Sequence, residues 1–281
     1  MNLSHFCLLS AAAMALSTAA PAANSQQNRQ TGSAVQASYS DLIDLADSAP
    51  LVIRAQIRKA TLVEPERAPG VRPGWARLYL EVKAQALLYG SSPLGEAQQL
   101  LADVKLDAKG KVPNLSKAVV LLFARTVPGH IGELQLTRPD GWLIWDTGTE
   151  TRLRGVLSDL NSPAAPSKVT GVREAIYVPG NLTGEGETQI FLIAQGDSPA
   201  ALSITHHPGQ PPVWTASFSE VVDSAGKPPP RDTLAWYRLA CFLPPILPPA
   251  ANVSQTDVEK SQAGADYGFV ISSLGPCGRT R

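Results

Sequence analysis

The sequence lacks every short motif that by itself names a reaction. It has no HExxH pair, no CxxC pair and no GxSxG turn, and its adjacent His206 and His207 have no third ligand at zinc spacing. Residues 90–95 are rich in glycine and serine, but Glu96 stands where a phosphate-binding loop requires Lys. We therefore predict no catalytic residue, no metal site and no cofactor.

Charge of one sign is not in excess either. The chain has 24 Lys and Arg against 24 Asp and Glu; residues 24–147 hold 14 basic and 12 acidic side chains, and residues 148–281 hold 10 and 12. A surface that binds nucleic acid or an anionic membrane needs a basic excess. The sequence therefore predicts a protein that does not bind nucleic acid.

The start of the chain lacks the Lys or Arg that a signal peptide usually carries, yet the rest of the pattern is there. Residues 6–23 are apolar, and Ala20-Pro21-Ala22 offers the small-x-small pattern of a signal peptidase site. The stretch is too short to span a bilayer comfortably. We expect residues 1–23 to be a signal peptide, residues 24–37 a flexible leader, and the mature chain to be periplasmic or secreted without a membrane span. A retained membrane anchor is the alternative.

Cysteine is scarce, since the chain has only three. Loss of the signal peptide removes Cys7 and leaves Cys241 and Cys277. An even pair in an exported chain predicts a disulfide. The bridge would close a loop of 36 residues (277 minus 241), worth roughly 3 to 4 kcal/mol in a chain-entropy estimate. Two buried free thiols are the alternative.

Short apolar segments are what the sequence does contain. Residues 119–123 are five consecutive large apolar side chains, which predicts a buried central strand. Shorter runs around it alternate between apolar and polar residues, as half-buried strands do. A short helix before them has Ser40 as its expected cap, and Arg54 or Arg58 is expected to pair with Glu81. The predicted strands of a domain over residues 38–146 are 51–59, 77–84, 102–106, 117–125, 133–136 and 142–145.

The order of these strands, with a long loop at residues 64–74, resembles the OB-fold and, more loosely, the exported netrin or tissue-inhibitor type of barrel. The segments that carry the resemblance are LVIRAQI (51–57), VKAQALLYG (82–90) and VVLLF (119–123). The resemblance implies a small closed antiparallel barrel. The N-terminal cysteines of the inhibitors are missing here, so protease inhibition is not implied. The whole chain resembles exported bacterial proteins of unassigned function, which implies a compartment and no chemistry.

Residues 147–281 predict a second, α+β domain. Thr147 and Glu150 form a capping box before a helix at residues 148–160, and a row of antiparallel strands follows. The apolar run at residues 189–194 is expected to lie in the centre of that sheet. Two helices then cover the sheet, and the disulfide joins them. The expected strands are 169–178, 188–194, 200–206 and 213–222, and the expected helices run from 232 to 243 and from 254 to 274.

The loop at residues 65–75 (PERAPGVRPGW) is the segment that we expect to bind a ligand or partner. Three prolines stiffen it, and it carries Arg67, Arg72 and Trp75. Guanidinium and indole groups on a preorganised loop suit an anionic or carbohydrate ligand, or a partner protein. An ordered surface loop without a partner is the alternative.

His206 and His207 are the most prominent polar pair, and a solvated hairpin end is the preferred interpretation. Adjacent strand residues point to opposite faces, which opposes a shared metal ion unless Pro208-Gly209 turns the backbone. Ser203 or Ser219 combines on paper with His206 and Asp223, and Glu185 with Glu187 offers two carboxylates in a turn. These groups support one competing class, an envelope hydrolase near His206 and His207. The favoured hypothesis is a non-enzymatic binding or assembly protein of the bacterial cell envelope, with an envelope protein or a small anionic or carbohydrate molecule as its partner.

Overall fold

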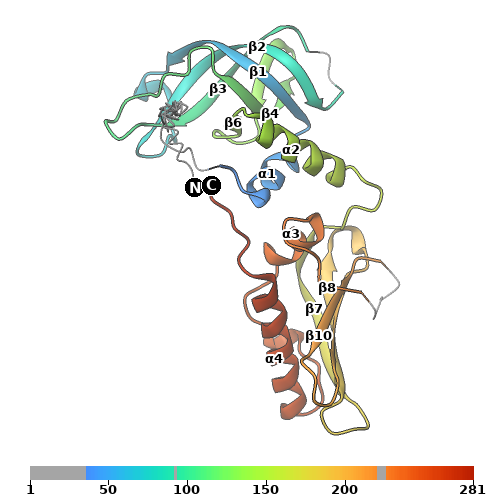
Figure 1. The fold of residues 1–281 in the computed structure, drawn as a ribbon. Helices are drawn as coiled ribbons and strands as arrows, with labels where there is room; N and C mark the ends of the chain where they lie inside the picture. The colour runs from blue at the N-terminus through green and yellow to red at the C-terminus, as the bar shows by residue number, and fades with distance from the viewer. Residues whose placement is uncertain (1–35, 92–93, 220–225) are drawn as a thin grey trace, which may run out of the picture. The chain divides into compact units, whose positions relative to one another are not determined.

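The computed structural model describes residues 36–91, 94–219 and 226–281. The expected signal peptide, nearly all of the expected leader and residues 220–222 of the last expected strand lie outside the described residues. By its internal contacts Val35–Arg281 forms one compact unit, and its described residues form two β-sheets and four α-helices (Figure 1). The expected domain boundary at residue 147 stays a prediction.

The first sheet closes on itself. Its strands follow the order β1-β2-β3-β5-β4-β6, and β1 also pairs with β4, so that five strands form a closed barrel and β6 extends β4. A closed ring with an odd number of strands cannot alternate direction throughout, and here β3 and β5 are parallel, at Gln99 and Glu133. The barrel is therefore mixed, and the prediction of an antiparallel barrel was wrong on this point. The strands are β1 (Leu51–Leu62), β2 (Trp75–Tyr89), β3 (Ala97–Lys105), β4 (Val119–Val127), β5 (His130–Leu136) and β6 (Trp142–Ile144).

Strand β4 takes the central place that its apolar run predicts. Its residues from Val120 to Ala124 are all buried, and it pairs with β1, β5 and β6. Alternate residues of β1, β2 and β3 point inward and fill the barrel with aliphatic side chains. The expected pairing of Arg54 or Arg58 with Glu81 was wrong, because Lys59 reaches Glu81 at 3.3 Å.

The N-cap residues of the two helices next to the barrel lie one or two positions before the predicted ones. Helix α1 (Tyr39–Ala46) is capped by Ser38, which forms a capping box with Asp41, whereas the predicted cap Ser40 is buried. Helix α2 (Thr147–Leu160) is capped by Asp146. The predicted Thr147 capping box does not form, because the Glu150 carboxylate turns to cations and an indole outside the first turn.

The second sheet is antiparallel, with the order β10-β9-β8-β7. Strand β8 lies inside it, as predicted from its apolar run. Helix α4 packs along the sheet beside β7, and α3 contacts the upper part of α4 (Figure 1). The elements are β7 (Val169–Pro179), β8 (Gly186–Ala194), β9 (Ala201–His206), β10 (Val213–Ser217), α3 (Leu234–Ala240) and α4 (Asp257–Leu274); three short 3-10 turns are η1 (Pro65–Arg67), η2 (Gln195–Asp197) and η3 (Pro249–Ala251).

The predicted disulfide is confirmed. Cys241, the C-cap residue of α3, is bonded to Cys277, which follows α4 by three residues. A hydrophobic cluster near this bridge contains side chains from all four helices and from the second sheet. Val52, Leu121 and Phe123 of the barrel belong to the same cluster. Within the described residues no helix is long and apolar enough to cross a membrane.

Candidate binding groove

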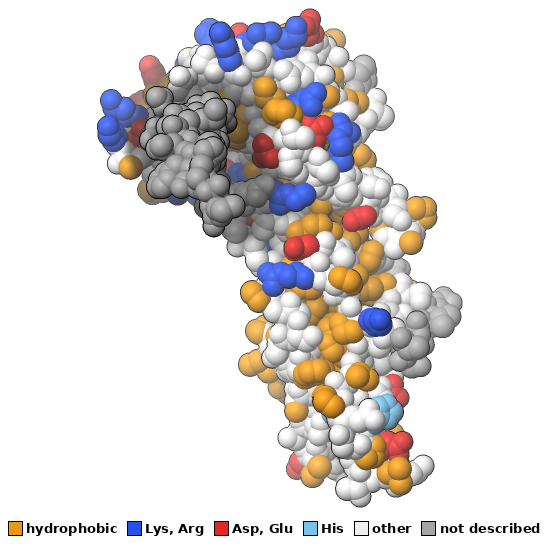
Figure 2. Space-filling view, viewed as in Figure 1, with side chains coloured by type: hydrophobic (Ala, Val, Ile, Leu, Met, Phe, Trp, Pro, Cys, Tyr) orange, Lys and Arg blue, Asp and Glu red, His pale blue; other side chains and the backbone are white. Residues whose placement is uncertain are grey.

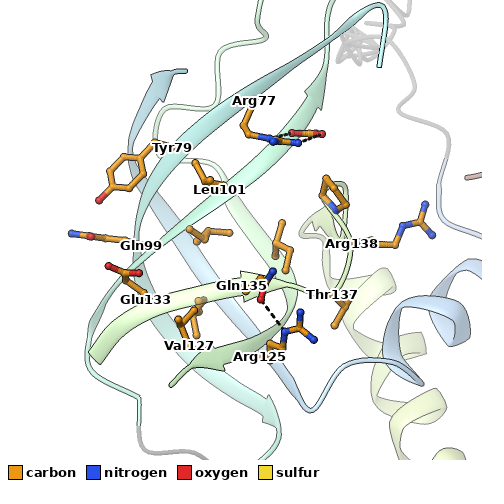
Figure 3. A pocket seen from close by; sticks show the side chains of 15 residues that line it. Arg77, Tyr79, Gln99, Leu101, Arg125, Val127, Glu133, Gln135, Thr137 and Arg138 are labelled. Carbon is orange, nitrogen blue, oxygen red and sulfur yellow. Dashed lines mark hydrogen bonds and ion pairs between the residues drawn. The ribbon is translucent and has the colours of Figure 1, made fainter. Parts of the chain in front are cut away.

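A groove of about 700 Å³ lies on the outer side of the barrel, and we call it the barrel groove (Figure 3). Strands β2, β3, β4 and β5 supply its walls, and residues 137–139, which we call the rim segment, close one end. The side chains that line the barrel groove are Arg77, Tyr79, Gln99, Leu100, Leu101, Asp103, Arg125, Val127, Glu133, Leu134, Gln135, Leu136, Thr137, Arg138 and Pro139.

The groove forms because β3 and β5 pair poorly. Their ladder consists of the single bridge between Gln99 and Glu133. The two chains meet again where the Asp103 amide donates to the Pro139 carbonyl at 2.7 Å. Between these two points the described strands form no further ladder pair, and the buried side chains of Leu100, Leu134 and Leu136 form an apolar floor.

The walls combine an aromatic ring with amide groups. Tyr79 and Leu101 project outward from β2 and β3, and 50% of the Leu101 side chain remains exposed. The amides of Gln99 and Gln135 lie on the same outer surface (Figure 3). An apolar floor with a few convergent polar groups is the usual composition of a ligand site.

One arginine in the groove has no acidic partner. Arg77 is held by Asp103 through two hydrogen bonds of 2.7 and 3.1 Å, which raise the pKa of its guanidinium. The Arg125 guanidinium donates instead to the neutral Gln135 amide at 3.0 Å. Across the described ranges no carboxylate lies within ion-pair distance of Arg125, so its positive charge is available to an anion.

The rim segment is fixed by a buried carboxylate. Burial alone would raise the pKa of Asp140, but hydrogen bonds and charge from Arg138 and Arg72 outweigh burial and hold that pKa below its ordinary value. Arg138 therefore points away from the groove in Figure 3, toward Asp140 at 2.6 Å. Arg72 reaches the same carboxylate at 2.9 Å.

The predicted recognition loop touches this rim and does not line the groove. Arg72 stacks on the Trp75 ring at 4.0 Å while it binds Asp140. Arg67 lies exposed on η1. The structure thus brings Arg72 and Trp75 together and leaves Arg67 apart. Their expected role in binding stays a prediction.

His206 lies elsewhere, between the second sheet and α4. Its Nε2 atom is 2.8 Å from an oxygen of the buried Asp266, which also accepts hydrogen bonds from Thr188 and Gln262. The pair does lie at the end of the β9–β10 hairpin and His207 is exposed, but the expectation that His206 is solvated was wrong, because its side chain is bound to Asp266. His206 helps to hold α4 on the sheet.

Two described hydroxyls around His206 have other hydrogen-bond partners. Thr188 donates to Asp266, and Ser203 is buried and donates to Gln189 at 2.9 Å, so neither hydroxyl faces the imidazole. Asp223 lies outside the described residues. Among the residues that the structure does describe, no cluster of three His, Cys, Asp or Glu side chains is arranged to hold a metal ion.

No family model matches this chain, and no curated protein matches its sequence. The barrel groove is therefore assigned from its own geometry and chemistry.

Sequence reasoning missed the groove residues, although part of the signal was present. The alternation in residues 75–83 and 97–105 places Tyr79 and Gln99 on the outer face of the barrel. It does not show that β3 and β5 are neighbours, since that adjacency follows only from closure of the ring.

A second groove of about 490 Å³ lies beside α4. Figure 2 shows hydrophobic side chains gathered over the region of α4 and the second sheet, whereas many Lys and Arg side chains gather over the barrel. Ile246, which lines the second groove, is 77% exposed.

Proposed function

We propose that this protein is a non-catalytic binding protein of the bacterial cell envelope, and that its barrel is an OB-type barrel that holds its ligand in the barrel groove. The closed order β1-β2-β3-β5-β4 and the position of the groove across β2 and β3 support this proposal. OB-type barrels bind oligonucleotides and oligosaccharides on the face of their second and third strands. The balanced charge of the chain favours the saccharide over the nucleic acid.

The ligand class that we propose is a saccharide chain that carries carboxylate groups. The observation that supports it most directly is Arg125, a guanidinium in the groove wall whose only partner in the described chain is a neutral amide. Guanidinium groups bind carboxylates in a bidentate geometry. Tyr79 offers a ring for a sugar face, and the amides of Gln99 and Gln135 offer donors and acceptors for hydroxyl groups.

Binding is tested by calorimetric titration with short uronic-acid oligosaccharides and with their neutral counterparts. We expect the acidic series alone to bind, and the Arg125→Gln variant to bind it at least tenfold more weakly, about 1.4 kcal/mol. Arg173→Gln is the matched control, because Arg173 is an exposed arginine on β7 outside the groove. Equal binding by Arg125→Gln and the native protein would refute the proposal, as would the absence of binding to any acidic oligosaccharide.

The envelope location rests on the apolar N-terminal stretch with its Ala20-Pro21-Ala22 pattern, and on a cysteine pair that forms a bridge. Expression in a bacterial host, followed by fractionation and mass measurement, tests it. The expected product is a periplasmic chain that begins at residue 23 or 24 and contains no free thiol. An unprocessed chain in the cytosolic fraction would refute it.

A further inference from the structure

The residues that follow the disulfide connect it to the rim of the barrel groove. We call residues 278–281 the strap. The strap follows Cys277, whose carbonyl accepts a hydrogen bond of 2.5 Å from Ser40 in α1. The bridge to Cys241 fixes this starting point against the end of α3.

The strap is next bonded along α1. Arg279 binds the Asp44 carboxylate at 2.6 and 3.1 Å. Thr280 donates to Asp41 through its amide at 3.0 Å and through its hydroxyl at 2.5 Å. Burial alone would raise the pKa of Asp41, but the hydrogen bonds from Thr280 and Ser38 prevail and hold that pKa below its ordinary value.

The last contact of the strap is with Asp140, in the connection between β5 and β6, and with Trp142, the first residue of β6. The Arg281 guanidinium donates to the backbone carbonyls of Asp140 at 2.8 Å and of Trp142 at 3.2 Å. Asp140 is the residue whose side chain holds Arg72 and Arg138, and Arg138 and Pro139 line the groove. A continuous series of bonded groups therefore runs from the disulfide through the strap to the rim segment.

We propose that the Cys241–Cys277 bridge controls the rim of the barrel groove through the strap, with Arg281 as the positioning residue. A dithiol reductant would transfer two electrons and two protons, break the S–S bond to give two thiols, and itself close to a disulfide. Both cysteines are partly exposed residues. Reduction frees Cys277 from α3, and the strap then holds the rim segment less well.

Hydrogen exchange measured by mass spectrometry over residues 137–142 tests this coupling without any ligand. We expect at least fivefold faster exchange in that segment after reduction, and a similar increase in the oxidised Arg281→Gln variant. Arg173→Gln again serves as the control and should exchange as the native protein does. Exchange of the β8 amides shows whether reduction unfolds the second sheet. If reduction unfolds that sheet, the coupling between the strap and the rim segment is judged from the oxidised Arg281→Gln protein alone.

Unchanged exchange in residues 137–142 in the oxidised Arg281→Gln variant would overturn the proposal. Unchanged exchange after reduction, with β8 still protected, would overturn it as well. We also expect the reduced protein to bind an acidic saccharide more weakly than the oxidised protein does. This expectation rests on the proposed function. If no saccharide binds at all, the exchange result still stands, so the two proposals fail separately.

Discussion

Asp266 shows how one buried side chain holds several elements together. Only 3% of it is exposed, and its carboxylate accepts hydrogen bonds from His206 on β9, Thr188 on β8 and Gln262 on α4. A buried carboxylate is tolerated only when its oxygens are satisfied in this way. The residue therefore fixes α4 against two strands of the second sheet.

We expect Asp266→Asn to destabilise the protein by about 2 to 3 kcal/mol. The amide keeps the shape of the carboxylate but replaces an acceptor by a donor, which faces other donors in a buried site. Urea unfolding followed by fluorescence measures the change in the free energy of unfolding. The exposed Asp159→Asn serves as the control and should change stability by less than about 0.5 kcal/mol. A similar small change for Asp266→Asn would mean that its bonds are replaced by water.

Glu150 makes a similar connection near the barrel. Its carboxylate, largely buried, accepts hydrogen bonds from Arg54 at 2.8 Å, Arg154 at 2.7 Å and the Trp145 indole at 2.5 Å. Burial would raise the pKa of Glu150, but these three donors outweigh it and the pKa is lowered. One side chain thus joins β1, α2 and the residue that follows β6.

The N-terminus of helix α4 is stabilised by a capping box in its first turn. Thr256 accepts from the Glu259 amide at 3.2 Å, and the Glu259 carboxylate accepts from the Thr256 amide at 2.9 Å. This capping box satisfies two backbone groups that would otherwise have no partner in the helix. The helix end is fixed by Gly275, whose φ of 67° lies in the left-handed region.

We expect Thr256→Ala to lower the free energy of unfolding by about 1 kcal/mol, because it removes the side-chain half of the capping box. Thermal and urea unfolding both measure the loss. Ser261→Ala, at an exposed position inside the same helix, should be neutral or slightly stabilising because alanine favours helices. If both variants unfold alike, the cap does not limit the stability of α4.

Periodicity predicts most of the elements, because an apolar pattern reports local burial. The helix at residues 148–160, the buried run at residues 119–123 and the Cys241–Cys277 bridge follow from residue type and spacing alone. What spacing does not report is which competing partner a polar side chain takes. Glu150 fits a capping box by position, but its carboxylate gains more from Arg54 and Trp145 in three dimensions.

The candidate site was harder to predict than the elements. The loop with Arg72 and Trp75 stands out in the sequence, yet Arg72 is bound to Asp140. Arg125 has no distinctive neighbours in the sequence, and its lack of an acidic partner depends on which strands lie beside β4. Such a property arises from closure of the barrel, so only coordinates reveal it.

Acid is expected to destabilise the whole molecule, because several carboxylates have lowered pKa values in the folded state. Asp41 and Asp140 have an ordinary value of 3.8 and Glu150 one of 4.5, and all three are lowered. A lowered folded pKa stabilises the protein above the unfolded pKa, and this contribution is lost as the pH falls through the folded pKa. Stability should therefore begin to fall below about pH 5 and decrease further toward pH 3.

Urea unfolding at pH 7, 5, 4 and 3 measures this dependence. Asp41→Asn should be less stable than the native protein at pH 7 and should show a flatter decline between pH 5 and pH 3, since it has one carboxylate fewer to protonate. A native protein whose stability does not change over that interval would contradict the expectation. An equally steep decline in the variant would show that Asp41 contributes little to it.

The bonds between α1 and the strap also set a limit on the order of assembly. Asp44 and Asp41 receive Arg279 and Thr280 from positions 235 and 239 residues further along the chain. During synthesis α1 is made early, but it gains these partners only after the ribosome has added Thr280. A growing polypeptide therefore cannot complete this region before that point. This delay is compatible with the export that we propose, since an exported chain crosses the membrane before it has folded.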